Sequence, residues 1–421
     1  MNIAIKLTSP KGYRALVPET VSDYLASSRD LATRLGGKPK EWQVREVGDG
    51  NLNLVFIIEG PASSLCLKQA LPYVRLVGES WPLPLSRAWF EHLALTEEAK
   101  YAPRFVPATH YYDDTMALTV MEYLTPHIIL RKGLIQGIKY PLVAKHLGEF
   151  LALTLYHTSD LFLPAEIKKK KIADFADNTA MCKISEDLIF DEPYFKAPMN
   201  RHSVGLDEVS VSFQNDADLK DAVQEMKWRF LNHAEAMIHG DLHTGSVMVT
   251  ENDTRAIDPE FAFFGPMGFD IGAIIGNFLL AYFSQPGHAK KSGEREAYAD
   301  WILAQIPVLW QSFSVLFADL CQQRTSQEPG GHVYAPRVLA MREKAIKQRL
   351  DAIWSDTLGF AGAKIIRRTL GLAHVEDMES IEDLKLRASC ERKALLFAKE
   401  LLLNRENYTT PSTLVDAARL K

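Results

Sequence analysis

The residues best suited to chemistry lie in two short loops. The first reads His239-Gly240-Asp241-Leu242-His243-Thr244-Gly245-Ser246, and the second reads Ala256-Ile257-Asp258-Pro259-Glu260. In phosphoryl transfer, one carboxylate orients the attacking hydroxyl, and others hold Mg²⁺ on the phosphates of the donor. Asp241 suits the first role, and Asp258 and Glu260 suit the second, with 17 positions (258 minus 241) between the two aspartates. Together the loops predict a phosphotransferase site.

Apolar residues frame the first loop. Met237-Ile238 before it and Val247-Met248-Val249 after it predict short buried strands that hold Asp241 rigidly. Taken singly, His-Gly-Asp is also compatible with a chance turn, and Asp-Pro-Glu with the start of a helix, where these residues are favoured. The ordered pair of loops favours the catalytic interpretation, because the chain also carries the other parts of a nucleotide site.

A glycine-rich segment precedes both loops. Residues 48–55 read GDGNLNLV and fit the kinase pattern GxGxxGxV, with Asn53 in place of the third glycine. Asp-Gly-Asn between apolar runs is also ordinary hairpin chemistry. Both interpretations can hold, because a hairpin covers the phosphates in kinases. Gly50 and Asn51 are therefore candidate ATP-binding residues.

A lysine and a glutamate complete the upstream pattern. Lys68 lies at the end of an apolar run, 13 residues after Val55, where kinases carry the lysine that contacts the phosphates. Lysine is rare in buried strands unless it is paired. Glu91, in a segment with helical spacing of apolar residues, is the candidate partner. The alternative is a solvated strand-end lysine and a solvated helix glutamate.

The chain resembles the 5-methylthioribose kinase family, in the aminoglycoside-phosphotransferase and choline-kinase branch of the protein-kinase-like fold. The resemblance rests on the first loop, on AIDPEFAFFGPMGFDIG at 256–272, on GDGNLN at 48–53 and on IIRRTLGLAHVEDMESI at 365–381. The twin arginine in the last segment separates this family from relatives that share the other motifs. The resemblance implies an α+β bilobal fold. A small antiparallel-sheet N-lobe, residues 1–124, would bind nucleotide and include the hinge, and a larger, mostly helical C-lobe, residues 125–421, would carry catalysis and the substrate.

The same resemblance implies a reaction: transfer of the γ-phosphate of ATP, with Mg²⁺, to the C1 hydroxyl of 5-methylthioribose in methionine salvage. Asp241 would contact and orient that hydroxyl, and Asp258 and Glu260 would bind Mg²⁺. Arg367 and Arg368 would bind the substrate side and the transferring phosphate, for which guanidinium groups suit. Without the resemblance, a solvated helix face would be the better interpretation of the two arginines. The implied ATP-binding residues are Gly50, Asn51, Lys68, Glu122, Tyr123, Leu124, Asp258, Pro259 and Glu260.

Three features depart from the protein-kinase pattern or lack a role. Ser246 stands where the catalytic loop of protein kinases has an asparagine that binds a second metal, and Glu260 could supply the missing oxygen. Trp81 lies in a proline-bounded segment that predicts a loop, either closing the site against water or acting as an aromatic staple. His243 and Thr244 receive no assignment.

Composition is that of an ordinary globular chain. The 421 residues are 47% hydrophobic and 24% charged, enough for two or three structural units. A net charge of -5 gives no electrostatic reason to expect nucleic acid as a partner. The one dense basic cluster, Lys168–Lys171, predicts a solvated helix end or loop. The four cysteines, at positions 66, 182, 321 and 390, lack a CxxC pair and predict reduced thiols in the cytosol.

We therefore expect a soluble cytoplasmic enzyme that does not bind a membrane. The N-terminus lacks the apolar centre of a signal peptide, and the most apolar run, 271–283, is short and contains Asn277. The resemblance adds a homodimer. The alternatives are another small-molecule kinase of the same fold, acting on choline, homoserine or an aminoglycoside, and a nucleotide-binding pseudokinase scaffold. The twin arginines oppose a cationic substrate, and the full set of Lys68, Asp241, Asp258 and Glu260 opposes a scaffold.

Overall fold

A computed structural model describes residues 10–48, 52–75, 78–323 and 339–421. The predicted ATP-binding residues Gly50 and Asn51 lie outside these ranges. The chain forms two compact units. Unit 1 runs to Pro126 and also contains Ile257–Phe261; unit 2 contains His127–Ala256 and Ala262–Lys421.

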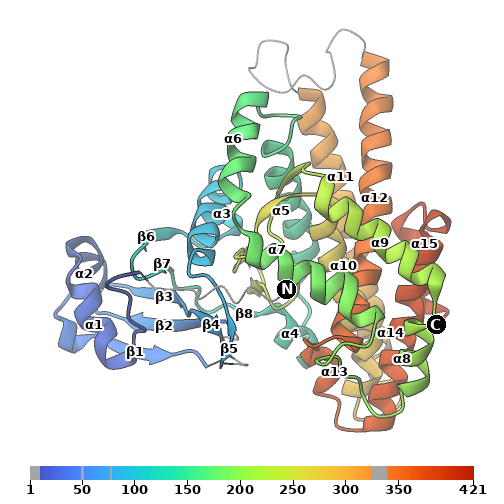
Figure 1. Cartoon of the computed structure of the whole chain (residues 1–421), viewed down its shortest axis with the longest axis horizontal. Coiled ribbons are helices and arrows are strands. Elements are labelled where there is room, and N and C mark those ends of the chain that lie inside the picture. The colour runs from blue at the N-terminus through green and yellow to red at the C-terminus, as the bar shows by residue number, and fades with distance from the viewer. Residues whose placement is uncertain (1–9, 49–51, 76–77, 324–338) are drawn as a thin grey trace. The chain divides into compact units, whose positions relative to one another are not determined.

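Unit 1 is built on a five-stranded sheet in the order β1-β2-β3-β7-β6, with every neighbouring pair antiparallel (Figure 1). Its strands are β1 (Gln43–Glu46), β2 (Asn53–Glu59), β3 (Ser64–Ala70), β4 (Tyr73–Val74), β5 (Gly78–Pro82), β6 (Thr109–Asp113) and β7 (Leu118–Glu122). Its helices are α1 (Pro18–Ala26), α2 (Arg29–Leu35) and α3 (Arg87–Tyr101). The antiparallel sheet confirms the sequence prediction for this part of the chain.

The alternation of side chains along β3 determines which face of the sheet Lys68 occupies. Successive side chains of a strand face opposite sides of the sheet. Leu65 and Leu67 lie on the face that forms an apolar core with Phe56 of β2 and with residues of α1 and α2. Lys68 therefore lies on the opposite face, away from that core. The prediction of a loop around Trp81 was wrong, because this residue belongs to β5, which pairs with β4. Strands β4 and β5 form a two-stranded sheet, so β5 is an edge strand, where the missing N–H of Pro82 is tolerated.

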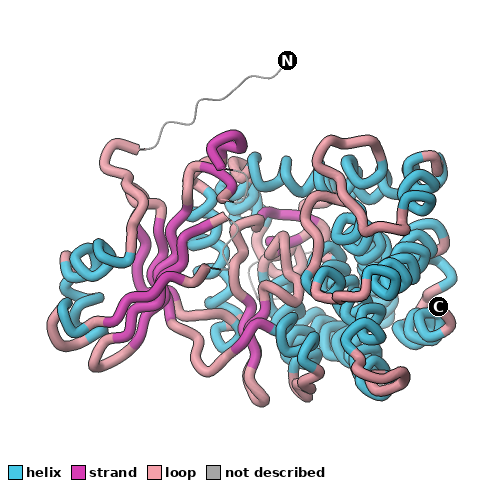
Figure 2. The backbone as a smooth tube through the Cα atoms, turned by 90° about the horizontal axis from the view of Figure 1, so that it is seen from below, coloured by secondary structure: helices cyan, strands magenta, loops and turns pink. Residues whose placement is uncertain are grey.

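Unit 2 is mostly helical, as predicted, with short strands that carry the loops (Figure 2). Its helices are α4 (Leu130–Gln136), α5 (Val143–His157), α6 (Ala165–Phe175), α7 (Thr179–Ser185), α8 (Asp207–Gln214), α9 (Ala217–Asn232), α10 (Gly268–Ser284), α11 (Glu296–Gln323), α12 (Leu339–Leu370), α13 (Glu376–Glu379), α14 (Leu384–Leu403) and α15 (Pro411–Arg419). Its strands are β8 (Ile128–Ile129), β9 (Ala236–Ile238), β10 (Val247–Val249), β11 (Thr254–Ala256) and β12 (Phe263–Gly265).

Helix α10 is the centre of unit 2. It is apolar around its whole circumference, nearly all of its residues are buried, and it packs against α11, α12 and α14. Glycines let α12 approach closely: a Cβ added at Gly272 would lie 2.6 Å from the carbonyl oxygen of Thr357. This close packing fixes the position of α12, the helix that carries the twin arginine.

Within the described residues, one helix, α11, is long and apolar enough to cross a membrane, with a mean hydropathy of 1.4 over 18 residues. Length and composition alone are weak grounds, because core helices of soluble proteins meet the same criterion. Helix α11 packs against α5 and α10. The run 271–283 that the sequence singled out lies within α10 and is almost entirely buried.

Candidate active site

In unit 1, Lys68 forms ion pairs with two carboxylates. Its Nζ lies 2.8 Å from Oε1 of Glu91, as the sequence predicted, and also pairs with Oδ1 of Asp258. The side chains of Lys68 and Glu91 are 11% and 4% exposed, so neither is a solvated residue. Burial opposes the charge on Lys68, but Asp258 and Glu91 outweigh it and raise the pKa of the ammonium group. Lys68 is therefore a fixed positive charge.

Asp258 and Glu260 lie in a segment that is neither helix nor strand, so the alternative that Asp-Pro-Glu begins a helix is wrong. The φ of Asp258 is +71°, in the left-handed region that is sparsely occupied by residues other than glycine. Such strain persists where the surroundings enforce it and clusters at functional sites. Glu260 is buried and accepts a hydrogen bond of 3.1 Å from Nδ2 of Asn53.

Arg87, which the sequence prediction missed, connects these parts. Its side chain is fully buried, and its Nε lies 3.3 Å from Oε2 of Glu260. Its guanidinium donates hydrogen bonds to the carbonyl oxygens of Leu71 and Leu52, at 2.6 and 2.7 Å, and to Oδ1 of Asn53 at 3.0 Å. One side chain thus connects Glu260 to Leu52, just before β2, and to Asn53, the first residue of β2. In the sequence, Arg87 looks like the solvated first residue of a helix, and no pattern marks it as buried.

Three carboxylates of unit 1 could hold a metal ion. Oxygen atoms of Glu91, Asp258 and Glu260 all lie within 4.8 Å of one another. Carboxylate oxygens are the ligands that Mg²⁺ prefers, so the donor set fits this ion. Glu91 is an addition to the predicted metal pair, and it is also the partner of Lys68. Burial raises the pKa of Glu91 to about 7, although Lys68 opposes the shift.

The predicted hinge follows β7. The strand ends at Glu122, whose backbone N–H donates to the carbonyl oxygen of Ala108 at 2.8 Å. Tyr123 and Leu124 lie outside helix and strand, and the hydroxyl of Tyr123 accepts a hydrogen bond of 2.9 Å from Arg45.

In unit 2, the loop with Asp241 follows β9, and a buried carboxylate binds the backbone of this loop. Asp270, in the first turn of α10, accepts hydrogen bonds from the backbone N–H groups of His239 and Gly240 at 2.6 and 3.0 Å. Gly240 has a φ of +84°, a conformation that favours glycine. The loop is therefore not a chance turn. Sequence reasoning missed Asp270, and the signal that could have revealed it is its place as a lone acid between Phe269 and Ile271.

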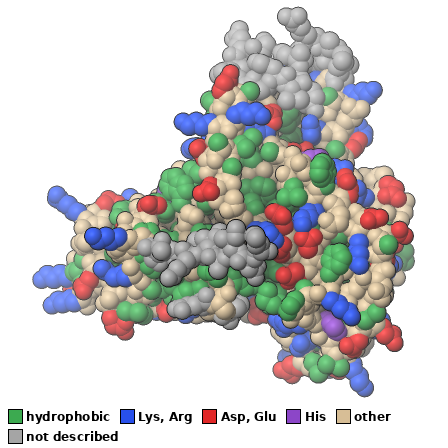
Figure 3. Space-filling model, in the orientation of Figure 1, with side chains coloured by type: hydrophobic (Ala, Val, Ile, Leu, Met, Phe, Trp, Pro, Cys, Tyr) green, Lys and Arg blue, Asp and Glu red, His purple; other side chains and the backbone are tan. Residues whose placement is uncertain are grey.

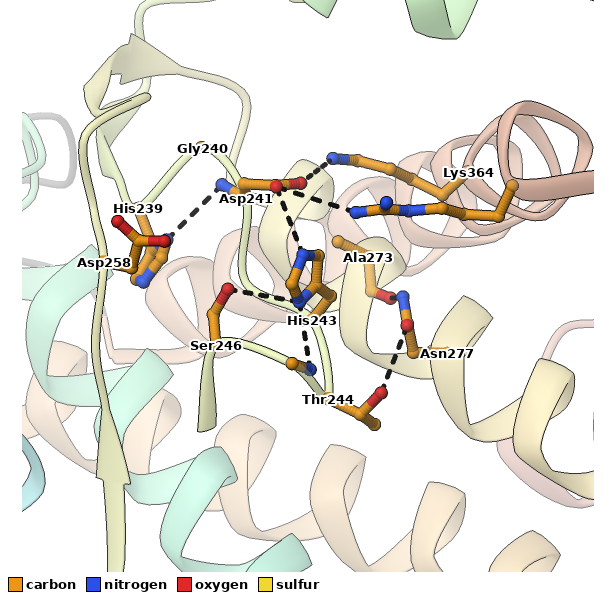
Figure 4. Close-up of polar contacts among 12 residues, drawn as sticks. His239, Gly240, Asp241, His243, Thr244, Ser246, Asp258, Ala273, Asn277 and Lys364 are labelled. Atoms are coloured by element: carbon orange, nitrogen blue, oxygen red, sulfur yellow. Dashed lines mark hydrogen bonds and ion pairs between the residues drawn. The ribbon is translucent and has the colours of Figure 1, made fainter. Parts of the chain in front are cut away.

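The Asp241 carboxylate is surrounded by nitrogen atoms (Figure 4). Lys364 Nζ lies 3.0 Å from its Oδ1, and Nε2 of His243 lies 3.3 Å from its Oδ2. Arg367 and Arg368 each approach to 3.7 Å. Burial alone would raise the pKa of Asp241, but Lys364, His243 and Arg367 hold it well below the usual range. Asp241 is therefore ionised at neutral pH.

Hydrogen bonds define the position and the tautomer of His243. Its Nδ1 accepts a hydrogen bond of 3.0 Å from the backbone N–H of Gly245 and lies 3.1 Å from the hydroxyl of Ser246. Burial lowers the pKa of the imidazole to about 3 despite the nearby Asp241. The neutral ring must then carry its proton on Nε2 and donate it to Asp241. Ser246 thus contacts His243.

The twin arginines are buried, so the alternative of a solvated helix face is wrong: Arg367 and Arg368 are 6% and 9% exposed. Nε and Nη1 of Arg367 have no hydrogen-bond partner among the described residues. Arg131 of α4 pairs with Asp377 of α13 at 3.0 Å. Buried donors without a partner are costly, and a phosphate would satisfy them.

The sheet with its Lys–Glu pair, the acidic cluster and the Asp241 loop define a phosphotransferase, and residues 43–301 match the phosphotransferase enzyme family. A methylthioribose kinase of Escherichia coli O45:K1 is 45% identical over 414 residues, which cover 98% of this chain and 99% of that one. Methylthioribose kinase 1 of Oryza sativa subsp. japonica is 45% identical over 94% of this chain and 93% of its own. This chain belongs to the methylthioribose kinase family.

Among solved structures, a choline/ethanolamine kinase family protein from Mesorhizobium loti is 15% identical, with a TM-score of 0.43, over 96% of this chain and 99% of that one. This similarity is too low to support an inference about the substrate.

Proposed function

We propose that this protein transfers the γ-phosphate of ATP to the C1 hydroxyl of 5-methylthioribose and produces the 1-phosphate for methionine salvage. The observation that carries the proposal is the convergence of two buried arginines on Asp241, in a chain 45% identical to methylthioribose kinases over nearly its whole length. The chemistry that follows uses these residues.

Asp241 acts on the attacking hydroxyl. Its ionised carboxylate accepts a hydrogen bond from the C1 hydroxyl and orients the oxygen toward the γ-phosphorus. As the bond from the C1 oxygen to phosphorus forms, the bond from phosphorus to the bridging oxygen breaks, its electron pair leaves with ADP, and the hydroxyl proton passes to Asp241. The transition state is loose, so positioning and charge stabilisation supply most of the catalysis. The low pKa of Asp241 keeps its carboxylate ionised, so that it accepts the hydrogen bond that orients the hydroxyl.

The unit 1 residues bind the nucleotide. Asp258 and Glu260 would hold Mg²⁺, which neutralises charge on the β- and γ-phosphates when bound. Lys68 would contact the phosphates, and Gly50, Asn51, Pro259 and the segment Glu122–Leu124 would complete the ATP site. Lys68 is suited to this role because it keeps its charge when buried.

The cations of unit 2 favour a substrate that is neutral before transfer and anionic after it. Lys364, Arg367, Arg368 and Arg131 outnumber the carboxylates of Asp241 and Asp377. Choline or an aminoglycoside would bring further positive charge into this cluster, at an electrostatic cost. A neutral sugar carries no such cost, and its product phosphate would be stabilised by the free donors of Arg367.

We also propose that residues 1–124 act as the nucleotide-binding lobe and 125–421 as the catalytic and substrate lobe. The protein would be a soluble cytoplasmic homodimer that binds neither nucleic acid nor membrane. The dimer is a family expectation, and light scattering after gel filtration tests it: the dimer mass would be twice the 47.3 kDa of the chain.

The test of the reaction is ATP consumption by purified protein with Mg²⁺ and a panel of 5-methylthioribose, ribose, choline, homoserine and kanamycin, followed by phosphorus NMR of the product. A 1-phosphate formed only from 5-methylthioribose is the expected result. Transfer to another alcohol would support the phosphotransferase class but contradict the proposed substrate. ATP binding without transfer to any alcohol would indicate a scaffold.

A further inference from the structure

Helix α12 presents a third cation to Asp241 besides the twin arginines. Positions 364, 367 and 368 are spaced by three and four residues, so their side chains share one face of the helix. Only the lysine reaches hydrogen-bond distance of the carboxylate, at 3.0 Å, against 3.7 Å for each arginine. Lys364 is therefore the closest cation to the group that takes the substrate proton.

The surroundings of Lys364 hold its ammonium group in place. The side chain is 3% exposed, and Nζ lies 4.5 Å from the centre of the Phe269 ring, where the ring face attracts a cation. Buried lysines are rare unless paired. The phenyl ring and Asp241 together hold the ammonium group in place. Figure 4 shows the contact between Lys364 and the Asp241 carboxylate.

We propose that Lys364 is a further catalytic residue, which binds the Asp241 carboxylate before transfer and a phosphoryl oxygen during transfer. The inference rests on the proposed phosphotransfer. When the C1 oxygen bonds to phosphorus and the hydroxyl proton moves to Asp241, the carboxylate loses the charge that holds Lys364. The transferred phosphoryl group brings negative charge to the same place, so the ammonium group exchanges one anionic partner for another and keeps its proton.

The charge on Lys364 depends on several neighbours. The charged groups that act on it are Asp241 from the loop, Arg367 and Arg368 from its own helix, and Asp270 from α10. His243 acts on Asp241, Arg131 of α4 acts on the two arginines, and Asp377 of α13 acts on Arg368, so these three groups influence Lys364 only through its neighbours. Burial lowers the pKa of Lys364 to about 8, while Asp241 opposes the shift and Arg367 adds to it. The lysine is protonated at neutral pH and loses its proton in mild alkali.

Three variants test the role. Lys364→Met removes the charge and keeps most of the side-chain volume, and Lys364→Arg keeps a charge. Lys347→Met is the matched control, because Lys347 is exposed on the same helix and forms an ion pair with the exposed Asp351. We expect kcat to fall about 100- to 1000-fold in Lys364→Met, the range for loss of one transition-state donor. KM for ATP should stay within about twofold, Lys364→Arg should recover part of kcat, and the control should match wild type.

The pH profile separates catalysis from support of the fold. With protonated Lys364 as the active form, wild-type kcat should fall as the pH rises through about 8. This fall should be absent in Lys364→Arg, because arginine keeps its proton there. If Lys364→Met does not fold, the kcat of Lys364→Arg and its pH profile are sufficient to test the proposal. A folded Lys364 variant with wild-type kcat, or an unchanged alkaline fall in Lys364→Arg, would overturn the proposal.

A binding measurement needs no turnover. ADP with tetrafluoroaluminate and Mg²⁺ mimics the transferring phosphoryl group. Its affinity should fall at least about tenfold in Lys364→Met, while ADP alone binds as in wild type. Equal affinity for the mimic in both proteins would count against Lys364. A wild-type protein that forms no 1-phosphate from 5-methylthioribose would refute the substrate, and the mimic would still decide the role of the lysine.

Discussion

The Asp241 carboxylate is held by donors from two directions. His243 and Lys364 each contact one of its oxygens, so its orientation is fixed before a substrate binds. The cations also keep it ionised. A carboxylate in this state is a weak base but a good hydrogen-bond acceptor, which suits a reaction whose barrier depends on positioning.

The first prediction concerns this carboxylate. Asp241→Asn keeps the shape but cannot take the proton, so kcat should fall by about 10²- to 10⁴-fold. Affinity for ATP, measured by calorimetry, should stay within about twofold. Asp221→Asn, at an exposed position of α9, is the control and should be neutral. Wild-type turnover in the Asp241 variant would contradict the assigned role.

The second prediction concerns the buried guanidinium with free donors. Arg367→Met should lower kcat/KM for the sugar about 10- to 100-fold, because a charge-assisted hydrogen bond to the sugar or phosphate is lost. Both KM for the sugar and kcat should change in steady-state assays. Lys347→Met on the same helix serves as the control. If only the melting temperature changed, Arg367 would be a structural residue.

At this scale, the sequence singled out the acids from their two loops and the twin arginines only through the family resemblance, and it could not identify the residues that support them. Lys364 lies 123 positions after Asp241, on a helix whose sequence does not reveal which face is buried. His243 was noticed in the loop, yet its contact with Asp241 depends on a ring tautomer set by Gly245. Such roles arise from packing and have no local pattern.

At the scale of elements, two supports fix the site residues. In unit 2, the glycines of α10 allow α12 to pack closely against it. This packing fixes the position of the cationic side chains of α12. In unit 1, Arg87 at the start of α3 joins Glu260 to the beginning of β2. Loss of either support would move several functional groups at once.

The third prediction tests the second support. Arg87→Met leaves Glu260 buried without its cation, and breaking a buried pair in this way costs about 3–5 kcal/mol of unfolding free energy. Affinity for ATP with Mg²⁺ should fall as well. Arg34→Met removes an exposed pair with Asp30 and should cost under about 1 kcal/mol. Urea unfolding of both variants measures the two losses of unfolding free energy, and equal midpoints would contradict the prediction.

Sequence periodicity predicted where helices form, but it did not predict which charged residues are buried. Apolar residues recur at helical spacing over 141–157 and 221–235 in the sequence, which predicts helices there, and α5 and α9 occupy most of these segments. The lysine run 168–171 was expected to be solvated, yet Lys168 is buried in α6, pairs with Asp160 and donates to the carbonyl oxygen of Glu235 at 2.8 Å. A charged side chain can be buried where partners from distant segments meet it, and no local pattern reports those partners.

At the scale of the whole molecule, the net charge and the face drawn in Figure 3 bear on possible partners. On the face drawn in Figure 3, acidic and basic side chains are interspersed over the described residues. The net charge is -5. Binding to a phosphate backbone requires a concentrated basic surface.

The fourth prediction follows from this charge. The protein should pass through a heparin column at 0.1 M salt without retention, because heparin captures proteins with a basic surface. A methylthioribose kinase variant with added surface lysines would be the positive control. Retention of the wild-type chain would show a basic surface that the net charge conceals.

The segment Ile257–Phe261 is the one part of unit 1 that comes from the second half of the chain. The backbone passes between the units after Pro126, before Ile257 and after Phe261. No single cut can therefore separate the two units, and a fragment ending at Pro126 would keep Lys68 and Glu91 while losing Asp258 and Glu260. Unit 1 cannot be expressed as an independent module, or exchanged between proteins, by a simple fusion at Pro126.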